Sequence, residues 1–583
     1  ALIHPDGLDV AALTEALAAL SAGRLLESQP GSPRIAPEST LQRTVYMERP
    51  AVAGEPTEFS ISYELTRYAQ HHRIDPARVV RAAATPELEP YLAEMMAFEH
   101  FLTVRANRHG KARYDLMKSL DPNHTITVHG ADPCVFSSGW REDHPLNRGN
   151  DWFYADDLDG VGCSSFPKWA GIDDADFGTR VECVKSAARD KKVWLSEVQG
   201  GRSAVGFDVY ESVDPASQQR WIWNGLACGA DTVLFWCWRD EVFGRESTGF
   251  GLAGNDGLAP ERLAAMRKTG AVLEAHGELL QAYEPAPAQV GILFSPQSYY
   301  LYWAQDGTAQ TALAGIQGYA RALVRRNIPY RIVEESHLDG LQGLKLLVVP
   351  RTVVMDDALA GALGEFVRRG GVVFCESETG AFDVAGVYRY PEARHLVALT
   401  GTREAGRRQL NGDSVVLELG GAAFEVPAAQ WLTPLVTDEG EALLAQVPVG
   451  KGRAILCGTY LGDAYLHRGG VAFEDFLVAL VAEAGVVRPA EVVSPQPVGS
   501  DFVHVRVGAA PGLGGADNGL RPLAFVFAPT PGATVELIFQ PGTFGEVARD
   551  LLSGKEIPIE SIDGGQKVTL EPTEWGIAVL AGV

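Results

Sequence analysis

Short apolar runs followed by polar or glycine residues are the clearest pattern in the first half of the chain. These runs stand at 125–128, 158–163, 193–197 and 232–238, with helical segments between them and a helical pattern over 58–120 before them. Apolar runs of this length that alternate with helices are typical of buried strands in a parallel sheet. The pattern therefore predicts four β/α units.

The same alternation returns after residue 288, beyond the sequence PAPA at 285–288, which is typical of a linker. The helices between the runs favour a flavodoxin-like, doubly wound sheet. Alternation on both sides of a Gly-Gly turn predicts a β-rich insertion at about 385–450. The predicted strands of the sheet are 290–295, 330–333, 344–350, 372–375 and 453–458.

From about residue 488 the chain carries strand patterns only, with Pro and Gly turns between them. Short strands at regular spacing predict a small antiparallel β-sandwich over 488–583. We expect a structural role for it, and sugar binding is the alternative, because carbohydrate-binding modules share this architecture. The expected organisation is thus a (β/α) region at 1–284, the flavodoxin-like region at 285–487 and the sandwich.

Composition excludes several classes of function. The net charge of −24 argues against nucleic acid as a partner, because phosphate binding relies on a basic face. Seven scattered cysteines without a CxxC pair predict neither a metal site nor a disulfide framework. With no long apolar run and no leader pattern, we expect a cytoplasmic protein that binds no membrane. The chain begins at Ala1, so a removed leader stays an open alternative.

Carboxylates stand where two of the predicted strands end. Glu197 closes the third run, and Glu246 follows the fourth, in a window that holds five of the eleven tryptophans. In an α/β barrel the carboxyl ends of the strands form the catalytic face. Aromatic rings beside carboxylates favour glycoside chemistry. The alternative is that the tryptophans fill the core and Glu197 is a solvated strand-end residue.

Cys375 also stands at the end of a predicted strand and offers a competing hypothesis. Folds of the amidotransferase type place a nucleophilic cysteine at such a turn. The sequence FCES lacks the glycines that flank such a nucleophile, so we expect no catalysis at Cys375.

The sequence SEVQGG, followed by GLACGADTVLFWCWRDEVFG, resembles the last two barrel strands of glycoside hydrolase family 42, the β-galactosidase family. The resemblance implies a (β/α)8 barrel in which Glu197 is the nucleophile of a retaining glycosidase. It assigns substrate binding to Trp238, Arg239 and Glu246. Gly249 stands where the family usually has a sugar-binding His, which makes galactose itself an open question.

We expect no cofactor or metal, and the resemblance implies a mechanism with a covalent intermediate. Glu197 would form a covalent glycosyl-enzyme, and Arg239 would either hydrogen-bond to Glu197 or bind a sugar hydroxyl. Trp238 would stack on the carbohydrate substrate and Glu246 would accept hydrogen bonds from it, with Trp236 and His129 as further contacts. In the family, the flavodoxin-like region joins three barrels, so a homotrimer is expected. The family's sixth strand leads into an Asp, where this chain has Ser164.

Four predicted strands do not close a barrel of eight. The family's acid/base is a glutamate after an asparagine, and this chain has no Asn-Glu pair; by family spacing the acid falls near Glu27, Glu38 or Glu48. Three explanations stay open: a divergent first half, strands from another polypeptide, or a processed chain. We expect an incomplete barrel that is completed elsewhere, in a homo-oligomer or a hetero-oligomer. A catalytically silent sugar-binding relative is the remaining alternative.

Overall fold

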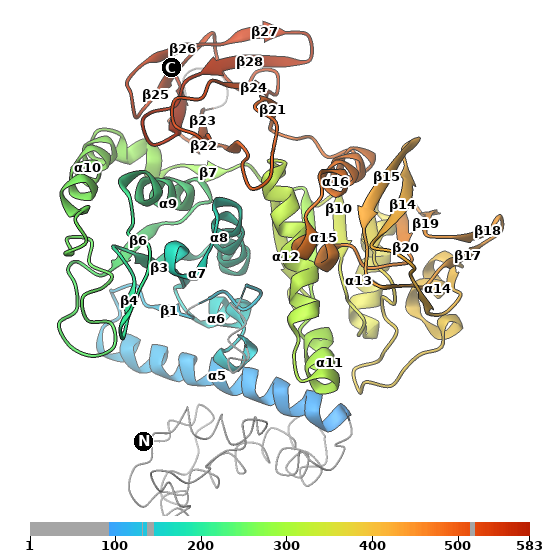
Figure 1. The fold of residues 1–583 in the computed structure, drawn as a ribbon. Coiled ribbons are helices and arrows are strands. Elements are labelled where there is room, and N and C mark those ends of the chain that lie inside the picture. Colours follow the sequence, from blue (N-terminus) through green and yellow to red (C-terminus); the bar gives the residue numbers. More distant parts are fainter. Residues whose placement is uncertain (1–91, 131, 137–144, 514–518) are drawn as a thin grey trace, which may run out of the picture.

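The computed structural model describes residues 92–130, 132–136, 145–513 and 519–583, which form three packed modules (Figure 1). A parallel four-stranded sheet with its helices comes first, a mixed six-stranded sheet with helices follows, and two antiparallel sheets end the chain. Helix α5 (Leu92–Leu120) runs along the lower side of the first module to α11 (Pro296–Asp306) of the second. The predicted helical pattern is confirmed over 92–120; its part over 58–91 lies outside the described residues.

The first sheet contains the four predicted strands, all parallel and in chain order. Each strand overlaps its predicted run, with ends that differ by a few residues. The strands are β1 (Thr127–His129), β2 (Gly160–Ser165), β3 (Lys192–Gln199) and β6 (Thr232–Trp236).

Helices cover one face of this sheet. Val161 and Leu195 point to that face and are fully buried against Phe177 and Trp221 of two of the helices. Burial of these apolar side chains is the main force that holds the strands and helices together. The covering helices are α6 (Asp151–Asp157), α8 (Asp174–Ala188) and α9 (Pro215–Ala227), and short elements of the same module are η1 (Pro145–Arg148), α7 (Pro167–Ala170), β4 (Ala204–Val205) and β5 (Asp208–Val209).

A β-bulge sets the register between β2 and β3. Cys163 pairs with Leu195, but the next residue of β2, Ser164, pairs with Glu197, so β3 has one extra residue at this point. The close approach of β2 to β3 also requires glycine at position 162, because a Cβ there would lie 2.0 Å from Ser196 Oγ. Bulges re-aim side chains at strand ends, and this one places Glu197 beside β2.

The two outer strands of the first sheet have one open edge each. In the described part of the chain, β1 pairs only with β2, and β6 pairs only with β3. Leu234 in β6 is 44% exposed, although parallel strands are normally buried on both faces. The described strands therefore form an open sheet and not a closed barrel.

The second module contains a sheet with the order β19-β20-β11-β10-β8-β9, parallel except for β19. Numbered along the chain, its parallel strands have the flavodoxin order 2-1-3-4-5, which confirms the predicted doubly wound sheet. The strands are β8 (Val290–Phe294), β9 (Tyr330–Glu334), β10 (Leu346–Val349), β11 (Val372–Cys375), β19 (Leu444–Val449) and β20 (Gly452–Cys457).

Helices cover both faces of this sheet. Val348 and Phe374 belong to the hydrophobic cluster of α12 and α16, whereas Leu347 and Val373 belong to the cluster of α13. Alternate residues of each strand thus face opposite helix layers. The helices are α12 (Gln310–Arg325), α13 (Asp357–Arg368), α15 (Gly462–Arg468) and α16 (Val471–Glu483), with η2 (Leu338–Leu341) beside them.

The β-rich insertion is confirmed between β11 and β20. Its main hairpin is formed by β14 (Ser414–Leu419) and β15 (Ala422–Pro427), which turn at Gly420 and Gly421. Both glycines have positive φ, as a tight hairpin turn requires. The other elements are η3 (Pro391–Ala393), α14 (His395–Thr400), β12 (Arg403–Glu404), β13 (Arg408–Gln409), β16 (Trp431–Leu432), β17 (Leu435–Thr437) and β18 (Gly440–Ala442).

The third module consists of two antiparallel sheets around one apolar cluster, which agrees with the predicted sandwich. Their orders are β21-β24-β28-β27 and β26-β25-β29-β23-β22-β7. The strands are β21 (Ala490–Ser494), β22 (His504–Pro511), β23 (Leu520–Phe527), β24 (Val535–Phe539), β25 (Val547–Asp550), β26 (Glu556–Pro558), β27 (Glu560–Ile562), β28 (Gly565–Leu570) and β29 (Ile577–Gly582).

The interpretation of 285–288 as a plain linker is wrong at its first residues. After α10 (Ala259–Gln281), Glu284 and Pro285 form strand β7, which pairs with β22 of the third module. The Ala286 amide continues this ladder by donating to the Val507 carbonyl. The chain therefore enters the second module while it is hydrogen-bonded to the third.

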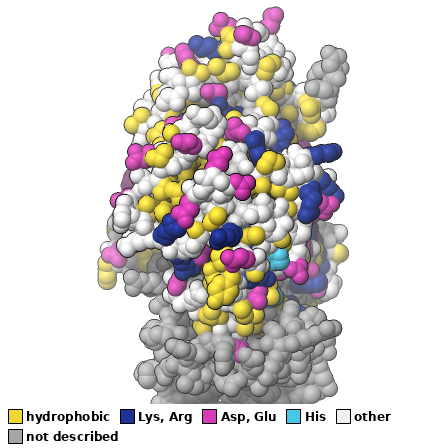
Figure 2. All heavy atoms as spheres, turned by 90° about the vertical axis from the view of Figure 1, so that its right-hand side faces the viewer, with side chains coloured by type: hydrophobic (Ala, Val, Ile, Leu, Met, Phe, Trp, Pro, Cys, Tyr) yellow, Lys and Arg dark blue, Asp and Glu magenta, His cyan; other side chains and the backbone are white. Residues whose placement is uncertain are grey.

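Figure 2 shows the face on the right-hand side of Figure 1, where acidic and basic side chains are interspersed with hydrophobic ones. No helix among the described residues is long and apolar enough to cross a membrane.

Candidate active site

Glu197 lies at the carboxyl end of β3, where its carboxylate is held by side chains from the two preceding strands. Ser164 Oγ donates to Glu197 Oε2 at 2.9 Å, and His129 Nε2 lies 3.4 Å from the same oxygen. His129 Nε2 is also 2.9 Å from Ser164 Oγ. His129 at the end of β1, Ser164 one residue before the end of β2, and Glu197 just after the bulge of β3 therefore form one contact group, which we call the strand-end triad.

Hydrogen bonding fixes the direction of donation in the strand-end triad. The Ser164 hydroxyl has one hydrogen, and because it donates to Glu197 it accepts from His129. This arrangement places a proton on His129 Nε2. The carboxylate of Glu197 is thus the final acceptor, which is the state that a nucleophile needs.

The same contacts lower the pKa of Glu197 below its ordinary value. The contact with His129 is the largest cause of the lowering, burial of the carboxyl opposes it, and the Ser164 hydrogen bond adds to it. Of the two roles expected for Arg239, the hydrogen bond to Glu197 is not formed in the described structure, where His129 and Ser164 contact that carboxylate. Arg239 is exposed in the loop after β6.

The strand-end triad does not have the geometry of an acyl-transfer triad. In a Ser-His-acid triad the acid and the serine contact different ring nitrogens of the histidine. Here Ser164 and Glu197 both lie beside Nε2 of His129. The arrangement therefore favours Glu197, and not Ser164, as the reactive group.

A second group of predicted site residues lies on the neighbouring strand β6 and the loop after it. The Trp236 indole Nε1 donates to Glu246 Oε2 at 3.2 Å, and Trp236 pairs in the sheet with Gln199, two residues beyond Glu197. Trp238 is 64% exposed, so its ring is free to stack on a ligand. The fold brings Trp236 and Glu246 into contact and leaves Trp238 and Arg239 at the surface.

The other tryptophans and acids of this window have structural roles. Trp221 and Trp223 are buried in the core, as the alternative interpretation expected. Asp240 accepts hydrogen bonds from the Gly251 amide at 3.0 Å and the Asn255 amide at 2.8 Å. Asp240 therefore shapes the loop that carries Glu246.

Gly249 has no room for the histidine that the family resemblance suggests. A Cβ at this position would lie 2.7 Å from the Ala204 backbone nitrogen and 2.9 Å from the Ala204 Cβ. The β4–β5 hairpin occupies that space, and it is tied to the loop by the bond from the Gly206 amide to the Arg245 carbonyl. Glycine in place of the family's histidine at position 249 thus fits the position of the β4–β5 hairpin, which fills the space that a side chain would need.

No second carboxylate acts on Glu197 among the described residues. The groups that shift its pKa are His129 and Ser164 alone, whereas a carboxylate close enough to act as acid/base would raise it. The three glutamates near which the acid was expected, Glu27, Glu38 and Glu48, lie outside the described residues.

The sequence analysis missed the part that Ser164 plays. Ser164 was noticed only as a departure from an expected Asp, and nothing in the local pattern indicated the bulge that pairs it with Glu197. The one available signal was its position at the carboxyl end of a predicted strand, next to a strand that also ends in a polar residue.

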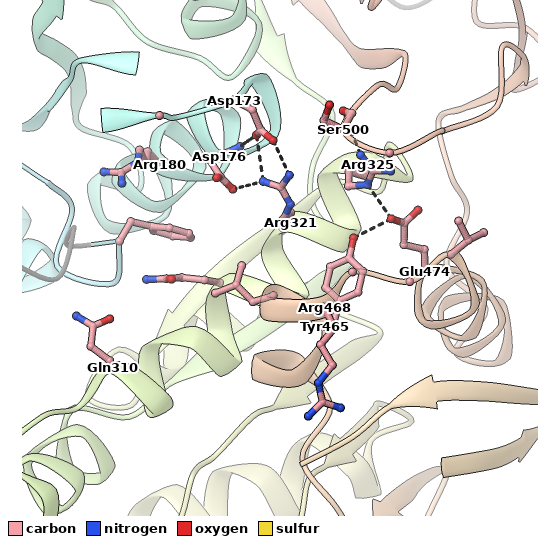
Figure 3. A pocket seen from close by; sticks show the side chains of 18 residues that line it. Asp173, Asp176, Arg180, Gln310, Arg321, Arg325, Tyr465, Arg468, Glu474 and Ser500 are labelled. Carbon is pink, nitrogen blue, oxygen red and sulfur yellow. Dashed lines mark hydrogen bonds and ion pairs between the residues drawn. The ribbon is translucent and has the colours of Figure 1, made fainter. Parts of the chain in front are cut away.

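Two other places in the fold hold groups that could form a site. Cys375 is buried, and burial raises the pKa of its thiol to about 12, which disfavours the reactive thiolate. A wide cleft of about 920 Å³ lies between the first and second modules (Figure 3). Most of its charged groups are paired across it: Arg321 contacts Asp173 and Asp176, and Arg325 contacts Glu474. We read it as an ion-paired seam between modules.

Comparisons with known proteins agree with this arrangement. A family model described as "Beta-galactosidase" matches residues 66–275, and one described as "Beta-galactosidase trimerisation domain" matches residues 288–469. Among curated relatives, Beta-galactosidase BgaH of Haloferax lucentense is 24% identical over 431 residues, which are 68% of this chain and 60% of the relative. Beta-galactosidase Bga of Halorubrum lacusprofundi is 23% identical over 453 residues, 70% and 62% of the two chains.

Solved structures match over most of the chain. Gan42B, a GH42 β-galactosidase from G. stearothermophilus, has a TM-score of 0.65 at 18% identity, and the β-galactosidase from Bacillus circulans sp. alkalophilus has 0.65 at 16%. Each match covers 84% of this chain and 68% of the other. The chain spans about 60% of the length of the curated relatives quoted above. Taken together, the two family models and the shared fold show that this chain belongs to glycoside hydrolase family 42, the β-galactosidase family, and carries that family's trimerisation domain.

Proposed function

We propose that this chain carries the nucleophile of a retaining glycoside hydrolase that acts on terminal β-galactoside-like sugars. The observation that supports the proposal most directly is the ionised carboxylate of Glu197, held by His129 and Ser164 at the carboxyl end of β3. The carboxyl ends of the strands are the catalytic face in barrels of this type.

The reaction takes two displacement steps. Glu197 attacks the anomeric carbon, the glycosidic bond breaks, and a carboxylic acid on the opposite side gives its proton to the leaving oxygen. Water then attacks the glycosyl-enzyme and passes a proton to the same acid, now a carboxylate, which releases the sugar and restores Glu197. Retention of configuration requires the two carboxyl groups to lie about 5–5.5 Å apart.

The groups next to β6 are placed to bind the sugar. Glu246, oriented by the Trp236 indole, accepts hydrogen bonds from ring hydroxyls, and the exposed ring of Trp238 stacks on the sugar face. Arg239 binds a hydroxyl and not the nucleophile. Because Gly249 leaves no side chain for the sugar, selectivity between galactose and its epimers rests on fewer contacts than in relatives with a histidine there.

The acid/base comes from outside the described residues in this proposal. The open edges of β1 and β6 and the exposed Leu234 support a sheet that additional strands complete. Those strands and the acid are supplied either by residues before Leu92 or by another polypeptide. Substituting Leu234 by Glu would charge this face and is expected to abolish turnover, whereas Val416→Glu, at a comparably exposed strand position in the insertion, is expected to leave turnover unchanged.

The second module supports assembly of several copies. A trimerisation domain indicates a homo-oligomer, and we propose the trimer as its state. Sedimentation of the purified protein measures this directly, and a monomer at micromolar concentration would contradict it.

The deciding experiment combines intact mass with turnover. The mass of the native protein shows whether a second polypeptide is present, and a panel of aryl β-glycosides is then assayed with the wild type, Glu197→Gln and the control Glu274→Gln. Glu274 is exposed on α10, away from the strand ends. Loss of the nucleophile is expected to lower kcat by about 10³-fold or more, with the control unchanged.

Proton NMR of the first-formed product reports the anomeric configuration, which is expected to be retained. Wild-type protein that is inert on the whole panel would instead support a catalytically silent, sugar-binding relative. Full activity in Glu197→Gln would overturn the role of Glu197.

A further inference from the structure

A histidine lies at the contact between the first two modules and binds a carboxylate of each. His337 follows β9 in the second module, and its Nδ1 lies 2.6 Å from Oε2 of Glu334, the last residue of that strand. Its Nε2 lies 3.0 Å from Oδ2 of Asp156 in helix α6 of the first module. The ring of Phe153, also in α6, packs against the imidazole with 5.5 Å between the ring centres. His337 therefore joins the two modules through both of its nitrogens.

Both contacts of His337 are hydrogen bonds only when the imidazole carries a proton on each nitrogen. An ionised carboxylate only accepts, and a neutral imidazole has a single N–H, so a neutral ring can donate to Glu334 or to Asp156 but not to both. The observed geometry therefore describes the imidazolium. Because only 11% of the His337 side chain is exposed and Glu334 is fully buried, solvent screens this pair little.

The two carboxylates favour the protonated ring. Burial lowers the pKa of His337, but the hydrogen bonds and charges of Glu334 and Asp156 outweigh it and raise that pKa above its ordinary value of 6.5. His337 also lines a pocket of about 380 Å³, through which its proton exchanges with solvent. Apart from Arg189, which pairs with Asp156, the charged side chains of the pocket lining are three acids and three bases: Glu182, Asp190, Asp339, Lys185, Arg331 and Arg506. Because these charges balance, Glu334 and Asp156 decide the protonation of His337.

The two carboxylates differ in how they respond to a neutral ring. Glu334 is fixed in place, because it also accepts from the Ser336 amide at 2.9 Å and from Asn150 Nδ2 at 3.3 Å. The Asp156 side chain is 45% exposed and has a second cation, Arg189, at 2.6 Å. A neutral ring therefore keeps its hydrogen on Nδ1 for Glu334, and the lone pair of its Nε2 repels Asp156. The contact with the first module is the one that is lost.

We propose that His337 is a pH-sensitive latch between the first module and the trimerisation domain, closed while the ring is protonated and opened on the Asp156 side when the ring is neutral. Its contribution to the closed state is fully present below pH 6.5 and is lost as the pH rises through the higher, folded-state pKa of His337. Helix α6 leads into β2, the strand that carries Ser164, so the latch affects how firmly the module with the strand-end triad is held. The inference does not depend on hydrolysis, because it concerns a contact between modules.

Hydrogen–deuterium exchange of the full chain tests the latch, because it reports local opening without global unfolding. Exchange over 151–157 and 334–341 is measured at several values between about pH 6 and about pH 9 and corrected for the intrinsic pH dependence of amide exchange. The variant His337→Gln replaces the ring by a group that does not titrate. Asp156→Asn leaves the ring in place and removes the charge on the first-module side.

In the wild type, corrected exchange over 151–157 is expected to increase about 10-fold or more across this range, because a hydrogen bond between charged groups is lost. In His337→Gln and in Asp156→Asn the increase should be less than about 2-fold. The control is His467→Gln, which should behave like the wild type, because His467 bonds to the Asp463 carbonyl within its own helix, α15. Wild-type exchange that does not change with pH would overturn the proposal.

The same increase in His337→Gln and Asp156→Asn as in the wild type would also overturn it, because the opening would then have another cause. A purely structural contact would instead raise exchange in both variants by the same factor at every pH, with the wild type itself unaffected by pH. Because the readout needs no turnover, the latch is tested equally well in a protein that proves inactive.

Discussion

Ser164 of β2 stands opposite Glu197 of β3 because a bulge shifts the register of the two strands by one residue. Without that shift Ser164 would pair with the residue before Glu197, whose side chain points to the other face of the sheet. The bulge therefore decides which side chain at the end of β3 meets Ser164 and His129.

Replacing Ser164 by alanine is expected to raise the pKa of Glu197, because the carboxylate loses one of its donors. A hydrogen bond is worth about 1 kcal/mol, so the acid limb of the kcat/KM profile should move up by about one pH unit or less. Ser164→Asp, which introduces the acid that the family resemblance suggests, should move it further, because a like charge would face Glu197. pH profiles of the three proteins check this. Identical acid limbs would show that Ser164 does not act on the nucleophile.

The contact of His129 with Glu197 is expected to make the free energy of unfolding decrease at acid pH. The pKa of Glu197 is lowered from 4.5, chiefly by His129, so the carboxylate stabilises the folded state above pH 4.5. This contribution is lost as the pH falls through the lowered, folded-state pKa. In His129→Ala the loss between about pH 5 and pH 3 should be smaller than in the wild type.

Urea unfolding of His129→Ala and the wild type at several pH values measures that difference. His124→Ala is the control, because His124 is exposed and contacts only Asp121 and its own turn. A pH dependence that is the same in all three proteins would contradict the assignment.

The tight contact at Gly249 predicts a cost for any side chain there. In Gly249→Ala the new Cβ would meet Ala204 at 2.7–2.9 Å, and overpacking of this kind costs about 1–3 kcal/mol. Gly270→Ala is the matched control, because Gly270 lies in α10 with nothing within 4 Å of its Cβ position. It should stabilise the protein by up to about 1 kcal/mol through helix propensity. Denaturant unfolding distinguishes the two. A neutral Gly249→Ala would show that the hairpin moves aside freely.

Arg321 is expected to hold the first two modules together. It donates to Asp173 at 3.0 Å and also contacts Asp176, so Arg321→Leu leaves two neighbouring carboxylates without their cation (Figure 3). Because the site is partly exposed, we expect a loss of about 1–3 kcal/mol in the free energy of unfolding. Arg369→Leu, which breaks an exposed pair with Glu365, should cost about 0.5 kcal/mol or less. Equal effects would show that the seam adds no stability.

The parallel strands of the first two modules could be predicted because each contains a short apolar run of its own. The antiparallel edge strand β19 was not predicted. Val372–Cys375 was predicted to its exact ends, and the doubly wound type of the second sheet followed from the alternation of its strands with helices. Strand β7 could not be predicted in this way. Glu284 and Pro285 have no strand pattern of their own and are ordered by β22, more than 200 residues further along the chain.

The candidate site was predictable only in part, for a related reason. Glu197 could be singled out from its position at a strand end, but its partners depend on how neighbouring strands align. The sequence analysis offered Arg239 as one possible partner of Glu197, with a sugar hydroxyl as its alternative target, whereas in the fold His129 and Ser164 contact the carboxylate. The register that a bulge sets depends on two strands together, so it cannot be predicted from the sequence of either strand alone.

Strand β7 also has a consequence for how the molecule comes apart. The segment that joins the first two modules is itself the edge strand of the third, so the third module cannot leave this junction without breaking backbone hydrogen bonds. Unfolding is therefore expected to proceed as one transition. A chain that ended before His504 would lose the strand that fixes this junction, and its first two modules would be joined only by their direct contacts, such as those of Arg321 with Asp173 and Asp176.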